Sequence, residues 1–280
     1  MHLGSLKYIF REIKQSSMAQ IKKGYIKGAV GDGVFREING RQLLSAQPKT
    51  MKQTSATKLH QVNFGKVSVL SSRFRSSISH LLNGFEDGTM ANRLTQEFYQ
   101  CMKTGFDMRT GEHTFEPDTF DGLSNFSFNA SSTVRMSVNI KPSITFVDQK
   151  LKISIPEFEV LSKISFPKHA ELCEIGVVVA IFNLRTGKRV ESLQGIKFKI
   201  DREQKIFTRQ ELQYDAPEDC LYIINLFNYF YYYFQTYPTL MNNKNFNPAG
   251  IYKALYNPGQ FVDTGVYQWE GVSSRKIAFK

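Results

Sequence analysis

The chain has 280 residues, 41% of them apolar, which is enough for one large domain or two ordinary domains with hydrophobic cores. Its 23 Phe and 13 Tyr stand beside a single Trp, and such an aromatic content favours β structure. This composition excludes a chain that is disordered throughout. No apolar stretch approaches the roughly 20 residues that a membrane-spanning helix needs.

The formal net charge of +11 is unevenly distributed along the chain. Residues 1–115 hold 17 of the 36 Lys and Arg but 8 of the 25 Asp and Glu, a net charge of +9, which leaves +2 for the remainder. Because a charged surface acts within about a Debye length, an acidic or polyanionic partner would meet the first part. A solvated basic face without a partner is the alternative.

The first 17 residues place apolar side chains at helical spacing with basic residues between them, as in Leu3, Leu6 and Ile9. They form either a short amphipathic docking helix or an extension upstream of Met18, and we favour the extension because MAQIKKG resembles a native start. No apolar h-region or cleavage site follows, so a secretory signal is not predicted. The three scattered cysteines, Cys101, Cys173 and Cys220, fit a reducing compartment, and we expect a cytoplasmic protein.

Residues 22–40 carry five glycines, too many for a helix interior, and predict extended or looped chain. Asn39-Gly40 separates two apolar runs, residues 34–38 and 41–44, and this dipeptide favours a two-residue hairpin turn. From Ser55 to Leu81 apolar residues recur every three to five positions, which predicts a long amphipathic helix. A break at residues 84–88 precedes a second predicted helix over residues 89–102.

From about Ser124 the apolar period changes to two, which predicts short strands. The segments predicted as strands are 126–128, 134–140, 144–146, 151–155, 158–164, 175–183, 190–200, 221–234 and 265–269. Short strands without long intervening helices indicate an antiparallel, immunoglobulin-like β-sandwich. The predicted class is therefore α+β: an extension over 1–17, a basic hairpin and helical segment over 18–115, and a β-sandwich domain over 116–280.

The run LYIINLFNYFYYYFQTY at residues 221–237 would be apolar or aromatic on both faces of a strand. It is either an exposed aromatic platform for a glycan, peptide or base, carried by Tyr229, Tyr231 and Tyr233, or a strand buried on both sides. We favour burial, because it explains every side chain except the tyrosine hydroxyls. The asparagine-rich segment 242–259 lies among prolines and is predicted to be a long loop with one helical turn near Tyr252.

Residues with catalytic or metal-binding chemistry do not fall into an established pattern. The glycine spacing matches no phosphate-binding loop, and the histidines and cysteines lack metal-ligand spacing. The acidic cluster at residues 116–121 departs from a calcium loop. Glu157 and Glu159 would share a strand face, but nothing beside them indicates a sugar-binding cleft. We therefore predict no catalytic, metal or cofactor site.

Two segments carry a family resemblance. Residues 22–74, with a glycine-rich start, a hairpin, a proline and a polar helix, resemble the start of uncharacterised small proteins from the Bacteroidota, and residues 153–184 are similar to their C-terminal β domain. The resemblance implies a fold and no functional residues. The matched positions are Gly24, Gly28, Gly31, Val34, Arg36, Gly40, Gln42, Pro48, Thr54, Gln61 and Phe64.

The sequence is compatible with three functions. The first is a non-enzymatic structural or interaction protein, in which the glycine-rich arm docks onto a partner or a neighbouring copy. The second is nucleic-acid binding through the basic N-terminal third. An enzyme acting on a glycan at the aromatic run, with Glu157, Glu159 or Asp219, ranks third. The residues that would contact a partner or polyanion are Lys22, Lys23, Lys27, Arg36, Arg41, Lys58, Lys66, Arg73 and Arg75.

Overall fold

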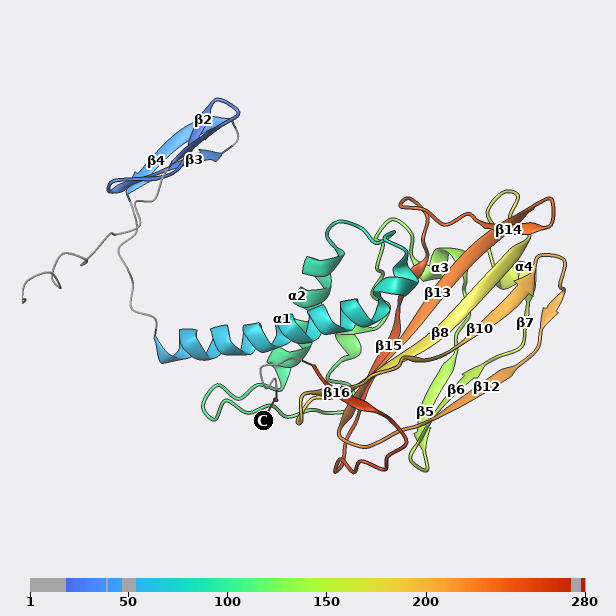
Figure 1. Cartoon of the computed structure of the whole chain (residues 1–280). Coiled ribbons are helices and arrows are strands. Elements are labelled where there is room, and N and C mark those ends of the chain that lie inside the picture. Colours follow the sequence, from blue (N-terminus) through green and yellow to red (C-terminus); the bar gives the residue numbers. More distant parts are fainter. Residues whose placement is uncertain (1–18, 39, 47–53, 273–277, 280) are drawn as a thin grey trace, which may run out of the picture. The chain divides into compact units, whose positions relative to one another are not determined.

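A computed structural model describes residues 19–38, 40–46, 54–272 and 278–279 of the chain. The chain divides into two compact units, Met1–Thr54 and Ser55–Lys280. We call the described part of the first unit the N-terminal sheet and the second unit the body. Antiparallel sheets dominate, and the described helices lie in the body, so the chain is a β-rich α+β protein (Figure 1). None of the described helices is both long and apolar enough to cross a membrane.

The N-terminal sheet is an antiparallel meander of four strands in chain order. It consists of β1 (Gln20–Lys22), β2 (Tyr25–Val30), β3 (Gly33–Ile38) and β4 (Arg41–Ala46). Ile38 pairs with Arg41 and Gly40 has a φ of +74°, which confirms the hairpin predicted at Asn39-Gly40, although Asn39 itself lies outside the described residues. Glycine tolerates this left-handed backbone without steric cost. The sequence did not predict β1 or β2.

A glutamine side chain joins β2 to β3 where their backbone pairing ends. The two strands pair at Gly28, Ala29 and Val30. Beyond Gly28, the amide of Gln42 accepts a hydrogen bond from the backbone N of Ile26 at 2.9 Å and donates to the carbonyl of Ile26 at 2.8 Å. It also donates to the carbonyl of Arg36 at 3.1 Å. Gln42 on β4 thus supplies the bonds that a backbone amide would supply in an unbroken ladder.

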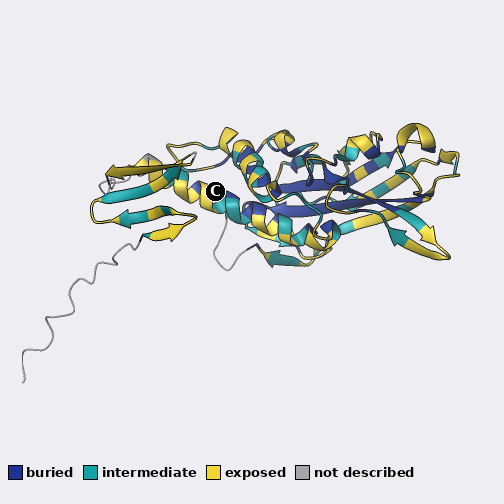
Figure 2. Cartoon of the chain, turned by 90° about the horizontal axis from the view of Figure 1, so that it is seen from above, coloured by how far each residue is buried: buried dark blue, intermediate teal, exposed yellow. Residues whose placement is uncertain are grey.

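The body is built on a central antiparallel sheet with two long strands in the middle, β8 (Leu172–Asn183) and β13 (Cys220–Phe234), which pair along twelve residues. Every residue of β8 and the first eleven of β13 are buried, so both faces of these strands are covered (Figure 2). The flanking strands are β9 (Lys188–Val190), β10 (Gln194–Asp201), β14 (Tyr237–Leu240), β15 (Ala249–Asn257) and β16 (Trp269–Gly271). The burial favoured for the aromatic run is therefore confirmed over residues 220–230.

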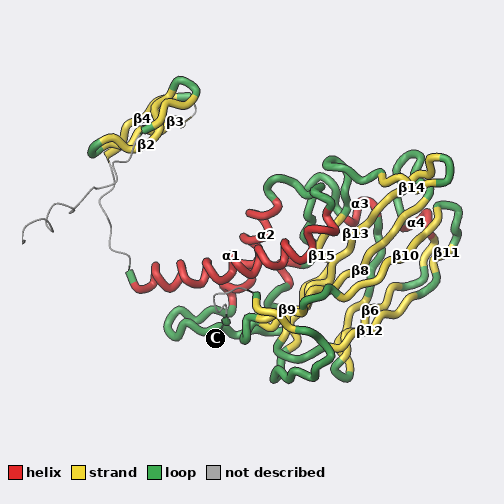
Figure 3. Tube along the Cα trace, in the orientation of Figure 1, coloured by secondary structure: helices red, strands yellow, loops and turns green. Residues whose placement is uncertain are grey.

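Two long helices cover one face of the central sheet (Figure 3). They are α1 (Ser55–Leu82) and α2 (Met90–Thr104), close to their predicted bounds, and the 3₁₀ turn η1 (Asp121–Leu123) follows them. Phe74 of α1 lies at the centre, with its ring centroid 6.0 Å from that of Phe98 on α2 and 6.4 Å from that of Phe182 on β8. The helices share a core with the sheet, so the boundary between units lies at Thr54/Ser55 rather than at 115/116.

Two small sheets and two single-turn helices cover the opposite face. Phe146 of this layer packs edge-on against Tyr222 of β13, with ring centroids 5.1 Å apart. The body thus has three layers, helices, central sheet and small sheets, rather than two sheets alone. The elements are β5 (Ser143–Val147), β6 (Lys150–Ile155) and β12 (Gln210–Asp215), then β7 (Phe158–Glu159) with β11 (Ile206–Phe207), and α3 (Val134–Ser137) and α4 (Val160–Lys163).

Some predicted strands have another structure. Residues 134–140 begin with α3, and residues 158–164 end in α4, because apolar residues four apart, such as Val134 and Val138, share a face in one helical turn as well as in a strand. Residues 126–128 form one isolated bridge to β15. The segment predicted as a loop over 242–259 contains β15, which pairs with β13 and is flanked rather than interrupted by its prolines.

Candidate functional site

The basic residues singled out by the sequence are divided between the two units. Lys22, Lys23, Lys27, Arg36 and Arg41 are exposed on the N-terminal sheet. The other four lie on α1. Lys58 and Arg73 are exposed there, and Lys66 and Arg75 are partly buried. The structure therefore does not gather the nine cations on one element.

Lys66 is engaged inside the body. Its ammonium donates a hydrogen bond to the carbonyl of Ala278 at 2.7 Å and lies 5.6 Å from the ring centroid of Phe279. Arg185 donates to the carbonyls of Phe279 and His113, at 3.4 Å and 2.9 Å. Lys66 thus helps to hold the segment around Phe279, which is a structural role that leaves its charge less available to a partner.

The first face of the N-terminal sheet carries Val30, Phe35 and Leu44, which the strand register places side by side. Val30 is 53% exposed and Leu44 63% exposed. Glu37 shares this face and pairs with Lys27 at 2.8 Å between ammonium and carboxylate oxygen. Hydrogen bonds and the charge of Lys27 lower the pKa of Glu37. This face is therefore apolar with compensated charge.

The second face combines apolar side chains with arginines. Every second residue of β3 faces this side, namely Val34, Arg36 and Ile38. Arg41 and Leu43 lie opposite them on β4. Ile38 is 51% exposed and Leu43 47% exposed. Neither arginine has an ion pair with a residue that the structure describes. The second face is therefore apolar with uncompensated positive charge.

Neither face of the N-terminal sheet is covered by another described part of its own unit. No residue that the structure describes in β1 to β4 is buried, and the strands contain no dark blue in Figure 2. A small sheet gains stability in water by burying an apolar face against another surface. The outer edges of β1 and β4 pair with no other strand among the described residues. The sheet thus presents two apolar faces and two open edges.

The three tyrosines of the alternative aromatic platform, Tyr229, Tyr231 and Tyr233, do not share an exposed surface. Tyr229 is buried, and its hydroxyl donates to the carbonyl of Leu81 at 2.6 Å. Tyr231 is half-buried and Tyr233 is 40% exposed. The exposed aromatic residues of this region lie at the end of the β13–β14 hairpin, where Phe234 pairs with Tyr237. In this run, the most exposed aromatic side chains therefore lie at the tip of one hairpin.

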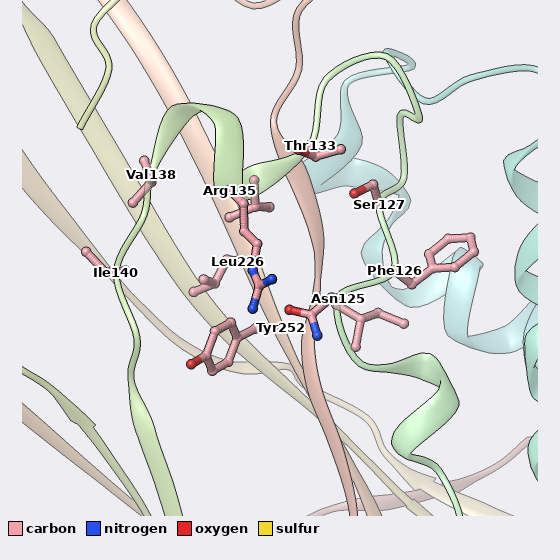
Figure 4. A pocket seen from close by; sticks show the side chains of 11 residues that line it. Asn125, Phe126, Ser127, Thr133, Arg135, Val138, Ile140, Leu226 and Tyr252 are labelled. Carbon is pink, nitrogen blue, oxygen red and sulfur yellow. The ribbon is translucent and has the colours of Figure 1, made fainter. Parts of the chain in front are cut away.

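A cavity of about 270 Å³ lies beside α3, and no motif in the sequence indicates it. Its apolar wall includes Val138, Ile140 and Leu226. Figure 4 shows the guanidinium of Arg135 directed between the side chains of Asn125 and Tyr252. Sequence reasoning missed this site because its lining comes from four separate segments of the chain.

Carboxylates, cysteines and histidines form no recognisable reaction centre in the described structure. Glu157 and Glu159 are exposed. Asp219 accepts from the hydroxyl of Tyr256 and lies 3.7 Å from Arg185. The three cysteines are buried and free. No group of three or more His, Cys, Asp or Glu is placed to hold a metal ion among the residues described.

Comparison with protein-family models, curated proteins and solved structures finds no match for this chain. The candidate sites therefore stand on their own geometry.

Proposed function

We propose that the N-terminal sheet is a docking element by which this chain, a non-enzymatic structural or interaction protein, attaches to a partner protein or to a neighbouring copy. The observation that supports this proposal is a sheet with apolar residues on both faces and none of its described residues buried. The central strands β8 and β13 of the body, which are also apolar on both faces, are covered on both. A sheet of this kind is suited to the inside of an assembly.

The geometry favours docking by a face, an edge or both. A surface laid on the sheet covers one face and leaves the other free, so complete burial of its apolar side chains takes two covering surfaces. The open edges of β1 and β4 can each accept a further strand, a mode in which main-chain hydrogen bonds supply affinity. Arg36 and Arg41 favour carboxylates on the surface that meets the second face.

Sedimentation velocity of the full chain over a range of concentrations tests this proposal. A neighbouring copy as the occupant gives a mass that rises with concentration, and Leu44→Ser or Leu43→Ser lowers that association. Leu161→Ser is the matched control, because Leu161 on the body has the same 63% exposure as Leu44. The proposal is overturned if the chain stays monomeric and deletion of residues 1–48 changes neither its solubility nor its bound partners.

Nucleic-acid binding by the same sheet is the second candidate. Lys22, Lys23, Arg36 and Arg41 are exposed within one small sheet of net positive charge. Phosphate contacts release counterions, so this function requires affinity for DNA or RNA that falls steeply as salt concentration rises. Titration of a labelled oligonucleotide at two salt concentrations distinguishes it, since binding that is absent or indifferent to salt removes the candidate.

A further inference from the structure

The cavity beside α3 has the layout of a small-molecule site, with an apolar wall and a polar mouth. The apolar wall comes from β13, β15 and the segment around α3. The polar side chains at the mouth are Asn125 and Ser127, Thr133 before α3 and Arg135 on α3. Tyr252 on β15 adds its ring, because its hydroxyl donates to the carbonyl of Pro142 at 2.9 Å. A second cavity of about 280 Å³ adjoins the first and shares Asn125, Arg135 and Tyr252 with it.

The charge at this place is positive and uncompensated. Among the described residues, no Asp or Glu lines either cavity. Arg135 also forms no ion pair with any residue that the structure describes. The other cation, Lys253, is paired with Asp121 at 2.7 Å. Arg135 therefore offers its planar fork of donors at the boundary of the two cavities, a geometry that matches a carboxylate.

Asn125 is held in a left-handed backbone conformation at the same place. Its φ is +63°, in the region that asparagine adopts more readily than most residues other than glycine. Its backbone N donates to the carbonyl of Tyr252 at 3.3 Å, which fixes the segment against β15. The amide side chain lies at the cavity mouth across from Arg135 (Figure 4).

We propose that the cavity beside α3 binds a small organic acid with an apolar body, whose carboxylate pairs with Arg135 and whose body lies against Val138, Ile140 and Leu226. An apolar cavity of about 150 Å³ accommodates benzene. The larger volume here accommodates a phenyl-sized group with a short chain that brings its carboxylate to the mouth. Asn125 and Tyr252 flank the carboxylate, and the second cavity admits water to it.

Three probes separate the contributions of charge and apolar body in isothermal titration calorimetry of the full chain. 3-Phenylpropanoate carries both features, 3-phenylpropan-1-ol keeps the body without the charge, and propanoate keeps the charge without the body. We expect the first to bind at least tenfold more tightly than either of the others. Equal affinity of the acid and the alcohol would overturn the role of the cation.

Two variants locate the binding at this cavity. Arg135→Gln keeps hydrogen-bond donors and removes the charge, so it weakens 3-phenylpropanoate at least tenfold and leaves the alcohol unchanged. Val134→Phe fills the cavity from a partly exposed rim position and weakens both probes. Arg109→Gln is the control, since Arg109 is exposed and lines neither cavity. The proposal is also overturned if the Kd of 3-phenylpropanoate is about 1 mM or higher. It is overturned likewise if Arg109→Gln weakens the binding of 3-phenylpropanoate as much as Arg135→Gln does.

Discussion

At the scale of single residues, His113 is a buried titratable group with an aromatic environment. It is 4% exposed, and neither ring nitrogen has a hydrogen-bond partner among the described residues. The rings of Phe106, Phe115 and Phe279 surround it, at centroid distances of 4.8, 5.7 and 5.2 Å. Burial, with the nearby charges of Lys66 and Arg185, lowers the pKa of His113 to about 4. The histidine is therefore neutral in the folded protein at neutral pH.

This histidine makes stability depend on pH. Its side chain in the unfolded chain binds a proton below about pH 6.5, and the folded state does so only below about pH 4, so the unfolded state binds more protons between these values. We expect the free energy of unfolding to fall as the pH falls through this window, by about 1–2 kcal/mol at pH 5. Urea unfolding at pH 7 and pH 5 measures the difference.

The control for this prediction is His113→Phe. A phenyl ring fits the aromatic surroundings and carries no proton, so the variant should lose most of the difference in stability between pH 7 and pH 5. An unchanged difference between the two pH values would assign the pH dependence to other groups.

Asp87 anchors the start of α2 through a network of hydrogen bonds. Its carboxylate accepts from the backbone N and the hydroxyl of Thr89 at 2.8 Å and 2.6 Å, from the backbone N of Ala130 at 3.0 Å, and from Arg93. Burial acts to raise the pKa of Asp87, and these hydrogen bonds outweigh it and lower the pKa to about 2.

Asp87→Asn should lower the free energy of unfolding by about 1–3 kcal/mol at pH 7, because it removes the charge that pairs with Arg93 and replaces an acceptor with a donor. Because the folded pKa lies below the unfolded one, this contribution is present above about pH 4 and is lost as the pH falls toward 2. Asp263→Asn is the exposed control. Equal urea midpoints for the two variants would contradict the role assigned to the network.

The buried asparagines of the body show which residues sequence reasoning misreads. The asparagine-rich run from residue 242 was taken for a loop. Asn242 accepts from the backbone N of Phe230 at 2.9 Å and donates to the carbonyl of Asn228 at 2.8 Å, while Asn247 accepts from Asn242. These amides bond to backbone groups at the end of β13, so their role depends on tertiary contacts that local sequence does not carry.

At the scale of elements, Gln42 is the residue on which the N-terminal sheet depends most directly. Gln42→Met keeps the length of the side chain and removes its three hydrogen bonds to Ile26 and Arg36. We expect faster hydrogen exchange at the amide of Ile26 and an unchanged body. Gln194→Met, on β10 of the body, is the matched control. Unchanged exchange at Ile26 would show that the side chain does not stabilise the junction of β2 and β3.

The long helices and long strands could be predicted from the sequence, because each has a strong local pattern. The apolar stripe of α1 and the two-sided apolar run of β13 correspond to the faces that are buried. The short elements could not be predicted, since a single turn such as α3 and a two-residue strand such as β7 have no period of their own. The cavity beside α3 depends on these short elements, so the sequence did not indicate it.

At the scale of the whole molecule, both hydrophobic clusters of the described structure lie in the body, and residues 19–46 contribute to neither. A chain that begins at Ser55 should therefore unfold cooperatively with a melting temperature within a few degrees of that of the full chain. Differential scanning calorimetry of both chains makes the comparison. Loss of a cooperative transition in the shorter chain would show that the N-terminal sheet is part of the folding unit of the body.

The division into two units also bears on which functions were predictable. The excess positive charge was assigned to the first part of the sequence, but four of the nine predicted contact residues lie on α1, and α1 belongs to the body. Charge counted along the chain does not reveal that Lys66 is engaged with Ala278. The apolar faces of the N-terminal sheet, rather than its charge alone, carry the proposed docking function.

Hydrogen exchange of residues 19–46, followed by mass spectrometry in the full chain, tests that docking function most directly. In dilute solution the uncovered sheet should exchange far faster than β13, which is buried on both faces. Exchange in residues 19–46 should slow when the docking surface is supplied, either by raising the concentration of the chain or by adding its partner. Exchange as slow as that of β13 in dilute, monomeric chain would contradict the proposed docking function, because the sheet would then already be covered by its own molecule.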